Sequence, residues 1–267
     1  MKLPFRLYAR SVMKGQPSNY FACSKKAGEW LFGQEIASTK ELTVLNNAVN
    51  VEEFGFNQID RMKVRRELKA RDSLVIGHIG RFNKQKNHEF MIDIFKEVHE
   101  KLPNAILVLV GEGHLRVDIE KKVKKIGLEE NVRFLGVRKD IANLMQGFDL
   151  FLFPSLFEGL PVVLVEAQAA GLNCIVSDTI TTETNVTGRL NFLSLNDPPS
   201  VWADTILSTS YGHEETAEIL REKGYDTVTM AKWLTGYYVG QAFSSKESLS
   251  FGGVSHDANL NNFYTDL

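Results

Sequence analysis

Residues 150–171 read LFLFPSLFEGLPVVLVEAQAAG, a stretch that contains an apolar strand, a loop and a helix. Leu150–Phe153 is apolar throughout, and a proline ends it. We expect the helix to begin at Pro161, because the first helical position needs no N–H. It should continue to Ala170, with Gly171 as its C-terminal cap. This succession predicts a buried strand that leads into a helix at the carboxyl end of a sheet.

The same alternation of strand and helix extends to both sides of this stretch. Further strands are expected at Leu74–Ile79, Ala105–Val110, Val132–Leu135, Asn173–Ser177 and Asn191–Leu195. Helical patterns occupy residues 88–101, 114–126, 139–147 and 161–170. Strands that alternate with helices pair in parallel through right-handed crossovers, and nearly unbroken apolar strands need helices on both faces. The sequence therefore predicts an α/β fold with a doubly wound, Rossmann-like parallel sheet.

The flanks of this domain follow other patterns. Residues 1–45 hold a basic helix and a short strand near Leu42–Leu45, which is too little to form a domain. Residues 46–238 should form the sheet domain and its C-terminal helices. Residues 239–267 lose periodicity and fill with Ser, Gly and Asn, so a disordered tail is expected there.

The composition is that of a soluble globular protein, with 43% hydrophobic and 24% charged residues. A net charge of −2 argues against a bulk electrostatic grip on nucleic acid, which needs clustered basic charge. The two cysteines lie far apart and outside any metal-binding spacing. No apolar run approaches the ~20 residues needed to cross a bilayer. We therefore expect a cytoplasmic location.

Four basic residues near the N-terminus recur every fourth position: Lys2, Arg6, Arg10 and Lys14. This spacing places them on one helical face. The face would either lie on anionic lipid headgroups, as a peripheral membrane contact at the inner face of the cell membrane, or be an ordinary solvated surface. Both interpretations stay open.

The start of the helix at Pro161 is expected to form an anion site. Free amides of its first turn, with that of Gly159, would face the crevice at the carboxyl end of the sheet, and helix N-termini attract phosphate. Glu158 and Glu166 flank this site. Carboxylates repel a diphosphate but accept strongly from hydroxyls. A ligand with a diphosphate between two polyols, a nucleotide sugar, would satisfy all of these groups.

The wider string P-S-x-x-E-G-L-P-x-x-x-x-E-A-x-A-x-G resembles the signature of retaining glycosyltransferase family four, whose members have the two-domain GT-B fold. The resemblance implies that Glu158 holds donor-sugar hydroxyls and that Glu166 binds the ribose. It also implies that the backbone of Gly159, Leu160 and Pro161 meets the donor sugar and the diphosphate.

Two further elements resemble the same family. Gly80, Arg81 and Lys86 match its G-R-x-x-x-x-K element, whose cations neutralise the departing diphosphate and so lower the barrier to its departure. The loop that contains Val137 and Arg138 matches the one that cradles the base. Because the backbone makes those contacts, the base stays open between UDP- and GDP-linked donors.

The chain contains one Rossmann-like domain and a remnant of a second, so the resemblance implies the C-terminal, donor-binding half of a GT-B fold. We expect a glycosyltransferase, or a truncated fragment of one, that transfers a hexose with retention. The donor would be a nucleoside diphosphate sugar. The acceptor would be a glycan or a lipid-linked glycan, and the reaction would belong to bacterial exopolysaccharide or capsule assembly. We expect this chain alone to have very weak activity or none, because the acceptor domain is missing. The alternative is a non-catalytic nucleotide-sugar-binding or partner subunit of a split or interrupted enzyme, with its N-terminal domain on a separate chain. A sugar-nucleotide epimerase is a third reading.

Several other motifs carry weaker signals for a site. Gly111-x-Gly113 is a weak signal for a dinucleotide cofactor, because Arg116 occupies the third glycine position. The chain has no Asp-x-Asp pair, so we expect no metal and no cofactor beyond the co-substrate. His78 should be structural, and three further histidines are expected on helix surfaces: His88, His99 and His114.

Overall fold

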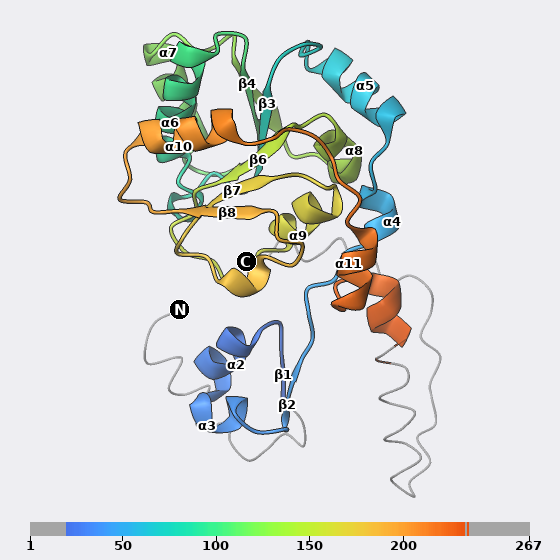
Figure 1. The fold of residues 1–267 in the computed structure, drawn as a ribbon. Coiled ribbons are helices and arrows are strands. Elements are labelled where there is room, and N and C mark those ends of the chain that lie inside the picture. Colours follow the sequence, from blue (N-terminus) through green and yellow to red (C-terminus); the bar gives the residue numbers. More distant parts are fainter. Residues whose placement is uncertain (1–19, 233, 235–267) are drawn as a thin grey trace, which may run out of the picture. The chain divides into compact units, whose positions relative to one another are not determined.

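The computed structural model describes residues 20–232 and residue 234. Its largest element is a six-stranded parallel sheet in the order β5-β4-β3-β6-β7-β8 (Figure 1). The strands are β3 (Val75–Ile79), β4 (Ile106–Val110), β5 (Val132–Gly136), β6 (Leu150–Phe153), β7 (Cys174–Ser177) and β8 (Leu190–Leu193). The chain moves outward from β3 to β5 and then returns to β6 on the other side of β3. The expected doubly wound sheet is confirmed, and its order reverses between β3 and β6.

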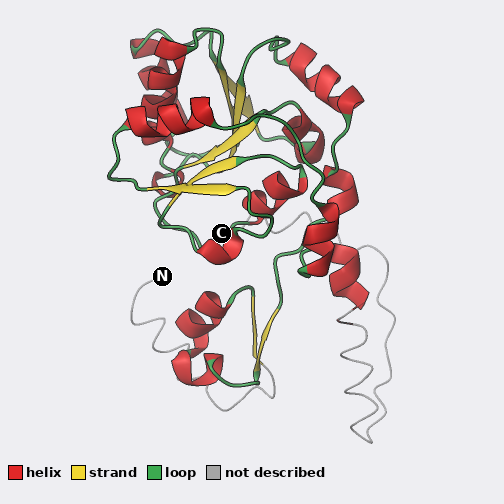
Figure 2. Cartoon of the chain, viewed as in Figure 1, coloured by secondary structure: helices red, strands yellow, loops and turns green. Residues whose placement is uncertain are grey.

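Helices cover both faces of this sheet (Figure 2). One face is covered by α6 (His88–Lys101), α7 (Arg116–Lys125) and α10 (Pro199–Ser208). The other is covered by α4 (Val51–Phe54), α5 (Gln58–Glu67), α8 (Ile141–Gln146), α9 (Val162–Ala169) and α11 (Ala217–Glu222). Residues 227–232 are helical as well.

Each central strand contributes to two hydrophobic cores. Val75 and Phe151 pack in one core, and their neighbours Ile76 and Leu152 pack in the other. All four side chains are fully buried. Successive side chains of a strand point to opposite faces, so an unbroken apolar strand fills both cores at once. This is the physical basis of the match between the apolar runs and the strands.

Helix α5 is tied to the sheet by a buried carboxylate. Asp149, whose side chain is 7% exposed, forms ion pairs with Arg61 and Arg65, and its Oδ2 accepts from the N–H of Val75 at 2.8 Å. These contacts join α5 to the starts of β3 and β6. Removing one partner of such a buried pair leaves an uncompensated charge, which is strongly destabilising.

Residues 20–44 form a small separate sheet. Strands β1 (Tyr20–Ala22) and β2 (Leu42–Val44) pair in parallel, and α2 (Lys25–Phe32) and α3 (Gln34–Ala37) lie between them in the chain. Ser24 caps α2, because its Oγ accepts from the N–H of Ala27 at 3.0 Å. The expected strand near Leu42–Leu45 is confirmed as β2.

The expected domain boundaries at residues 45 and 238 stay predictions. The basic N-terminal stripe and the tail at 239–267 lie outside the described residues. No described helix has the length and apolarity that crossing a bilayer requires.

Candidate functional site

Two loops meet where the strand order reverses, at the carboxyl ends of β3 and β6. The first contains the 3-10 helix η1 (Lys84–Lys86), and the second leads from β6 to α9. The N–H of Leu156 donates to the Gln85 carbonyl at 2.8 Å. In return, Gln85 Nε2 donates to the Phe157 carbonyl at 3.0 Å, and Asn87 Nδ2 donates to the Pro154 carbonyl at 3.2 Å. In doubly wound folds this reversal point is where ligands bind.

An ion pair joins the two loops. Lys86 Nζ lies 2.7 Å from Glu158 Oε1, and the two side chains are only 16% and 9% exposed. The same ammonium lies 4.6 Å from the centre of the Phe153 ring, within the range of a cation–π contact. The sequence assigned Lys86 to the diphosphate and Glu158 to the donor sugar. The structure brings these two side chains together, and their separate roles toward a ligand stay predictions.

The loop that holds Gly80 and Arg81 is fixed by backbone contacts with the loop after β4. The N–H of Gly80 donates to the Val110 carbonyl at 2.9 Å, and that of Phe82 donates to the Glu112 carbonyl at 2.9 Å. Gly111 has φ of 132°, and a Cβ there would lie 2.2 Å from the Gly80 carbonyl oxygen. The glycine therefore permits a close backbone approach and accounts for the V-G-x-G motif. The Arg81 side chain, set on this fixed loop, is exposed.

Helix α9 begins one residue later than the sequence predicted. Pro161 is its N-cap rather than its first helical residue, and no side chain of the described residues caps the first turn. The Leu164 N–H donates to the Pro161 carbonyl at 3.1 Å, in an i→i−3 bond that tightens this turn. Val162 and Val163 therefore contribute the first amides of the helix. Such amides are the groups that bind phosphate at helix N-termini.

The residues around the start of α9 differ in their contacts and burial. The Leu160 carbonyl accepts from Asn47 Nδ2 at 2.8 Å, which connects the loop to the chain segment that enters the domain. Gly159 is exposed, and no described atom lies within 4 Å of the place where its Cβ would be. Glu166 lies in the second turn of α9 and is half-buried. Its assignment to the ribose stays a prediction.

The loop expected to cradle the base follows β5. Val137 is 72% exposed, whereas the Arg138 guanidinium pairs with Asp140 at 2.7 Å and with Glu67 at 2.6 Å. The hydrogen bonds that Arg138 donates to Asp140 and then to Glu67 raise the pKa of Arg138. The Arg138 side chain is thus engaged with protein carboxylates. The expected contact between this loop's backbone and a base stays a prediction.

Two histidines lie beneath the site. His78 is buried as expected, and its Nδ1 donates to the Leu152 carbonyl at 2.9 Å. His88 was expected on a helix surface, and that prediction is wrong. It is 1% exposed and stacks on Phe82 with ring centres 4.1 Å apart, because the first turn of α6 packs under the Gly80 loop.

Burial governs the protonation of both rings. Desolvation, followed by the charge of Lys86, lowers the pKa of His88 to about 4. Desolvation and then His88 lower the pKa of His78 well below its usual value. Both rings are therefore neutral near pH 7. Lys86 and Arg81 are the cations that the predicted phosphate-binding element brings to this end of the sheet.

Within residues 20–232 and 234, no three His, Cys, Asp or Glu side chains gather so as to hold a metal ion. The expectation of a metal-free diphosphate site stays a prediction.

Known proteins resemble this chain in both sequence and fold. Residues 60–192 match the family described as glycosyl transferases group 1. The chain is 41% identical over 227 residues to EpsF of Bacillus subtilis (strain 168), over 82% of this chain and 59% of EpsF. This chain contains a glycosyltransferase group 1 domain. All the predicted site residues, from Gly80 to Glu166, lie within the matched range.

Two further matches show what this glycosyltransferase group 1 domain resembles. The chain is 31% identical over 189 residues to CapH, a capsular polysaccharide biosynthesis glycosyltransferase of Staphylococcus aureus, over 64% of this chain and 52% of CapH. The structure of Anabaena Alr3699/HepE in complex with UDP and glucose matches with a TM-score of 0.71 at 21% identity, over 90% of this chain and 67% of that one. The α/β fold with a parallel sheet is thereby confirmed, and it is compatible with a Rossmann-like domain of the GT-B fold. The chain spans a little over half the length of EpsF and CapH.

Proposed function

We propose that this chain binds a nucleoside diphosphate sugar at the β3–β6 reversal point and forms the donor side of a retaining hexosyltransferase. The acceptor would be a glycan or lipid-linked glycan in bacterial exopolysaccharide or capsule assembly. The observation that carries the proposal is the meeting of Lys86, Glu158 and the first turn of α9 at one edge of the sheet. Relatives named for capsular polysaccharide synthesis support the biological setting.

The site offers each part of the donor a chemical partner. The amides of Val162 and Val163 and the cations Arg81 and Lys86 would face the diphosphate. Glu158 would accept from donor-sugar hydroxyls, and Glu166 from the ribose. The Lys86–Glu158 pair would then shift, so that the ammonium meets a phosphate while the carboxylate meets a hydroxyl. UDP is the first nucleotide to test, since the HepE structure contains it.

In the proposed transfer the configuration at the anomeric carbon is retained. The bond between the anomeric carbon and the phosphate oxygen breaks, and negative charge develops on the diphosphate. Arg81, Lys86 and the helix amides stabilise that charge. The acceptor oxygen bonds to the anomeric carbon on the same face, and its proton passes to the departing phosphate oxygen. A protein nucleophile is not required.

A second candidate is a donor-binding subunit that acts with a separate chain. In either case the donor site belongs to this chain, whereas the acceptor and its lipid carrier would bring the assembly to the inner face of the membrane.

Calorimetric titration with UDP, GDP and their common sugar conjugates tests the proposal. We expect nucleotides with one of the two bases to bind saturably, at one site per chain. Arg81→Ala should weaken that binding. In an enzyme reconstituted with an acceptor domain, Glu158→Ala and Arg81→Ala should each abolish transfer. The absence of binding by any of these nucleotides, or near-normal turnover in either variant, would contradict the proposed function.

A further inference from the structure

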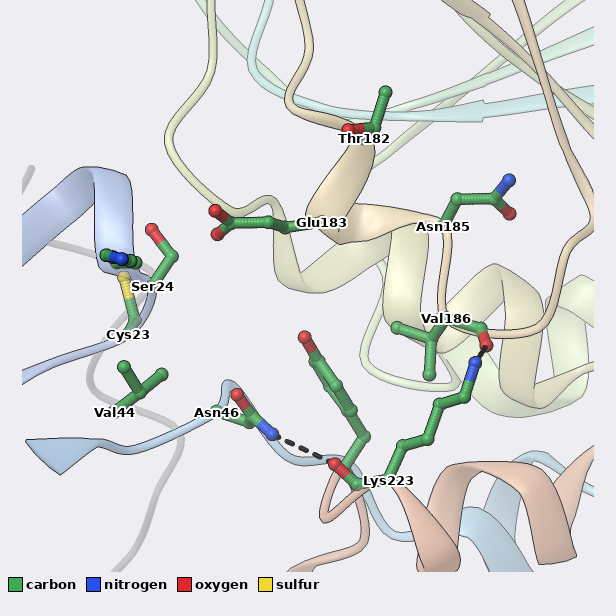
Figure 3. A pocket seen from close by; sticks show the side chains of 11 residues that line it. Cys23, Ser24, Val44, Asn46, Thr182, Glu183, Asn185, Val186 and Lys223 are labelled. Atoms are coloured by element: carbon green, nitrogen blue, oxygen red, sulfur yellow. Dashed lines mark hydrogen bonds between the residues drawn. The ribbon is translucent and has the colours of Figure 1, made fainter.

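A cavity lies next to the chain segment that contacts the loop assigned to the donor sugar (Figure 3). Its volume is about 410 Å³, which is within the range of small-molecule sites, about 300–1,000 Å³. Four segments form its walls: the start of α2, the segment after β2, the 3-10 helix η2 (Thr182–Thr184) and the turn after α11. The side chains that matter here are Ser24, Asn46, Glu183, Lys223 and Tyr225.

Hydrogen bonds hold the rim of this cavity in place. Asn46 Nδ2 donates to the Lys223 carbonyl at 3.1 Å, and Lys223 Nζ donates to the Val186 carbonyl at 2.6 Å (Figure 3). The Glu183 carboxylate is exposed and points toward the wall that Ser24 forms. These contacts give the cavity a fixed frame and a carboxylate that faces its interior.

The lining suits a polyol. A carboxylate accepts strongly from hydroxyls, and a tyrosine provides both an apolar ring and a polar tip. Tyr225 is 8% exposed, and burial, followed by the charge of Glu183, raises its pKa, so its hydroxyl stays protonated as a donor. An aromatic face beside hydroxyl-binding groups matches a sugar ring, which has apolar C–H faces and polar edges.

The cavity is connected to the donor site through two adjacent residues. Asn46 lines the cavity, and Asn47 donates to the Leu160 carbonyl at 2.8 Å. Leu160 belongs to the loop assigned to the donor sugar and diphosphate. The cavity itself is lined by none of the residues assigned to the donor. A ligand in it would therefore lie next to the donor sugar without occupying its place.

We propose that this cavity binds a sugar residue of the acceptor glycan, with Glu183 accepting from its hydroxyls and Tyr225 packing on its ring. This inference rests on the proposed function, since it assigns the neighbouring loop to the donor. Glu183 and Tyr225 act in binding, and the chemistry of transfer stays with the donor site. The proposal places part of the acceptor specificity in this chain.

Saturation-transfer NMR with methyl α-D-glucopyranoside and methyl α-D-galactopyranoside tests this inference on the full chain. We expect saturation transfer to at least one glycoside, and binding about tenfold or more weaker in Glu183→Gln, because a charge-assisted hydrogen bond is lost. Tyr225→Phe retains the ring and should weaken binding less. Glu129→Gln, an exposed acid outside the cavity, is the matched control and should bind as the wild type does.

Three outcomes would overturn the acceptor assignment. They are no transfer to either glycoside, equal transfer in Glu183→Gln and wild type, or displacement of the glycoside by a UDP-sugar. Titration of UDP into the same variants separates this result from the proposed function. Normal UDP binding without glycoside binding would contradict the acceptor subsite alone. Absence of UDP binding in the wild type would contradict the donor site.

Discussion

Lys86 is the residue whose environment most constrains the candidate site. Its ammonium is 16% exposed, pairs with Glu158 and lies over the Phe153 ring. A cation held in this way is worth more toward an incoming phosphate than one in open solvent, because the surrounding dielectric is lower. The neighbouring Lys84 lies on the same 3-10 helix but is exposed. This contrast supplies a matched pair of variants.

Lys86→Met should weaken nucleoside diphosphate binding by about tenfold or more, through loss of a charge-assisted contact. Lys84→Met should change the affinity little, since an exposed charge is screened by solvent and salt. Calorimetric titration of both variants measures the difference, and a thermal unfolding scan controls for folding. Equal nucleotide affinity in the two variants would show that Lys86 does not bind the phosphate.

His88 should make stability depend on pH. Its pKa is about 4 in the folded chain and about 6.5 when exposed, so the unfolded state alone takes up a proton between these values. The contribution of His88 to the free energy of unfolding is therefore fully present above about pH 6.5 and is lost as the pH falls toward about 4. The loss assigned to His88 amounts to about 2 kcal/mol at pH 5.

Urea unfolding at pH 7 and pH 5 checks this dependence. His88→Phe should reduce the difference in the free energy of unfolding between pH 7 and pH 5. A neutral ring then replaces one that becomes protonated in the unfolded state. The exposed His114 provides the control, and His114→Gln should leave the difference unchanged. A pH dependence that is identical in His88→Phe and wild type would show that this ring does not titrate on unfolding.

At the scale of elements, the contact between the β3 and β4 loops sets the position of Arg81. Gly111→Ala would place a methyl group 2.2 Å from the Gly80 carbonyl oxygen, so the backbone must shift. Gly127 also has a positive φ, 73°, but has no described atom within 4 Å of its Cβ position. Gly127→Ala therefore measures backbone strain without the clash.

Both alanine variants should lose stability through strain, and Gly111→Ala should lose more. Only Gly111→Ala should also weaken nucleoside diphosphate binding, because the loop of Arg81 moves. Urea unfolding and calorimetric titration of the two proteins separate these effects. Normal nucleotide affinity in Gly111→Ala would show that this loop contact does not position the site.

The strands could be predicted from sequence because each is apolar on both faces, as Leu150–Phe153 illustrates. Helix α5 could not, since Val64 is its one buried residue and its ion pairs reach the distant Asp149. The site loops were located by their motifs. Contacts made by side-chain amides, such as those of Gln85 and Asn47, depend on which loops the fold brings together. His88 was misplaced for the same reason.

At the scale of the whole molecule, the strand order of the sheet reverses between β3 and β6, and doubly wound folds bind ligands at the carboxyl ends of the strands at such a point. The amides at the start of α9 lie at that edge with Lys86 and Glu158 nearby. If they grip a pyrophosphate, the response of the molecule to a nucleotide should be concentrated there and should depend on the phosphates rather than on the nucleoside.

Amide-resolved NMR of the whole chain, titrated with UDP and separately with uridine, tests this most directly. GDP and guanosine serve as the second pair. The amide signals of Gly159, Val162 and Val163 should move with the diphosphate and stay in place with the nucleoside, while residues at the opposite edge of the sheet stay unchanged. If both diphosphates bind and leave these three signals in place, or move them no more than the nucleosides do, the pyrophosphate is not held at this helix end.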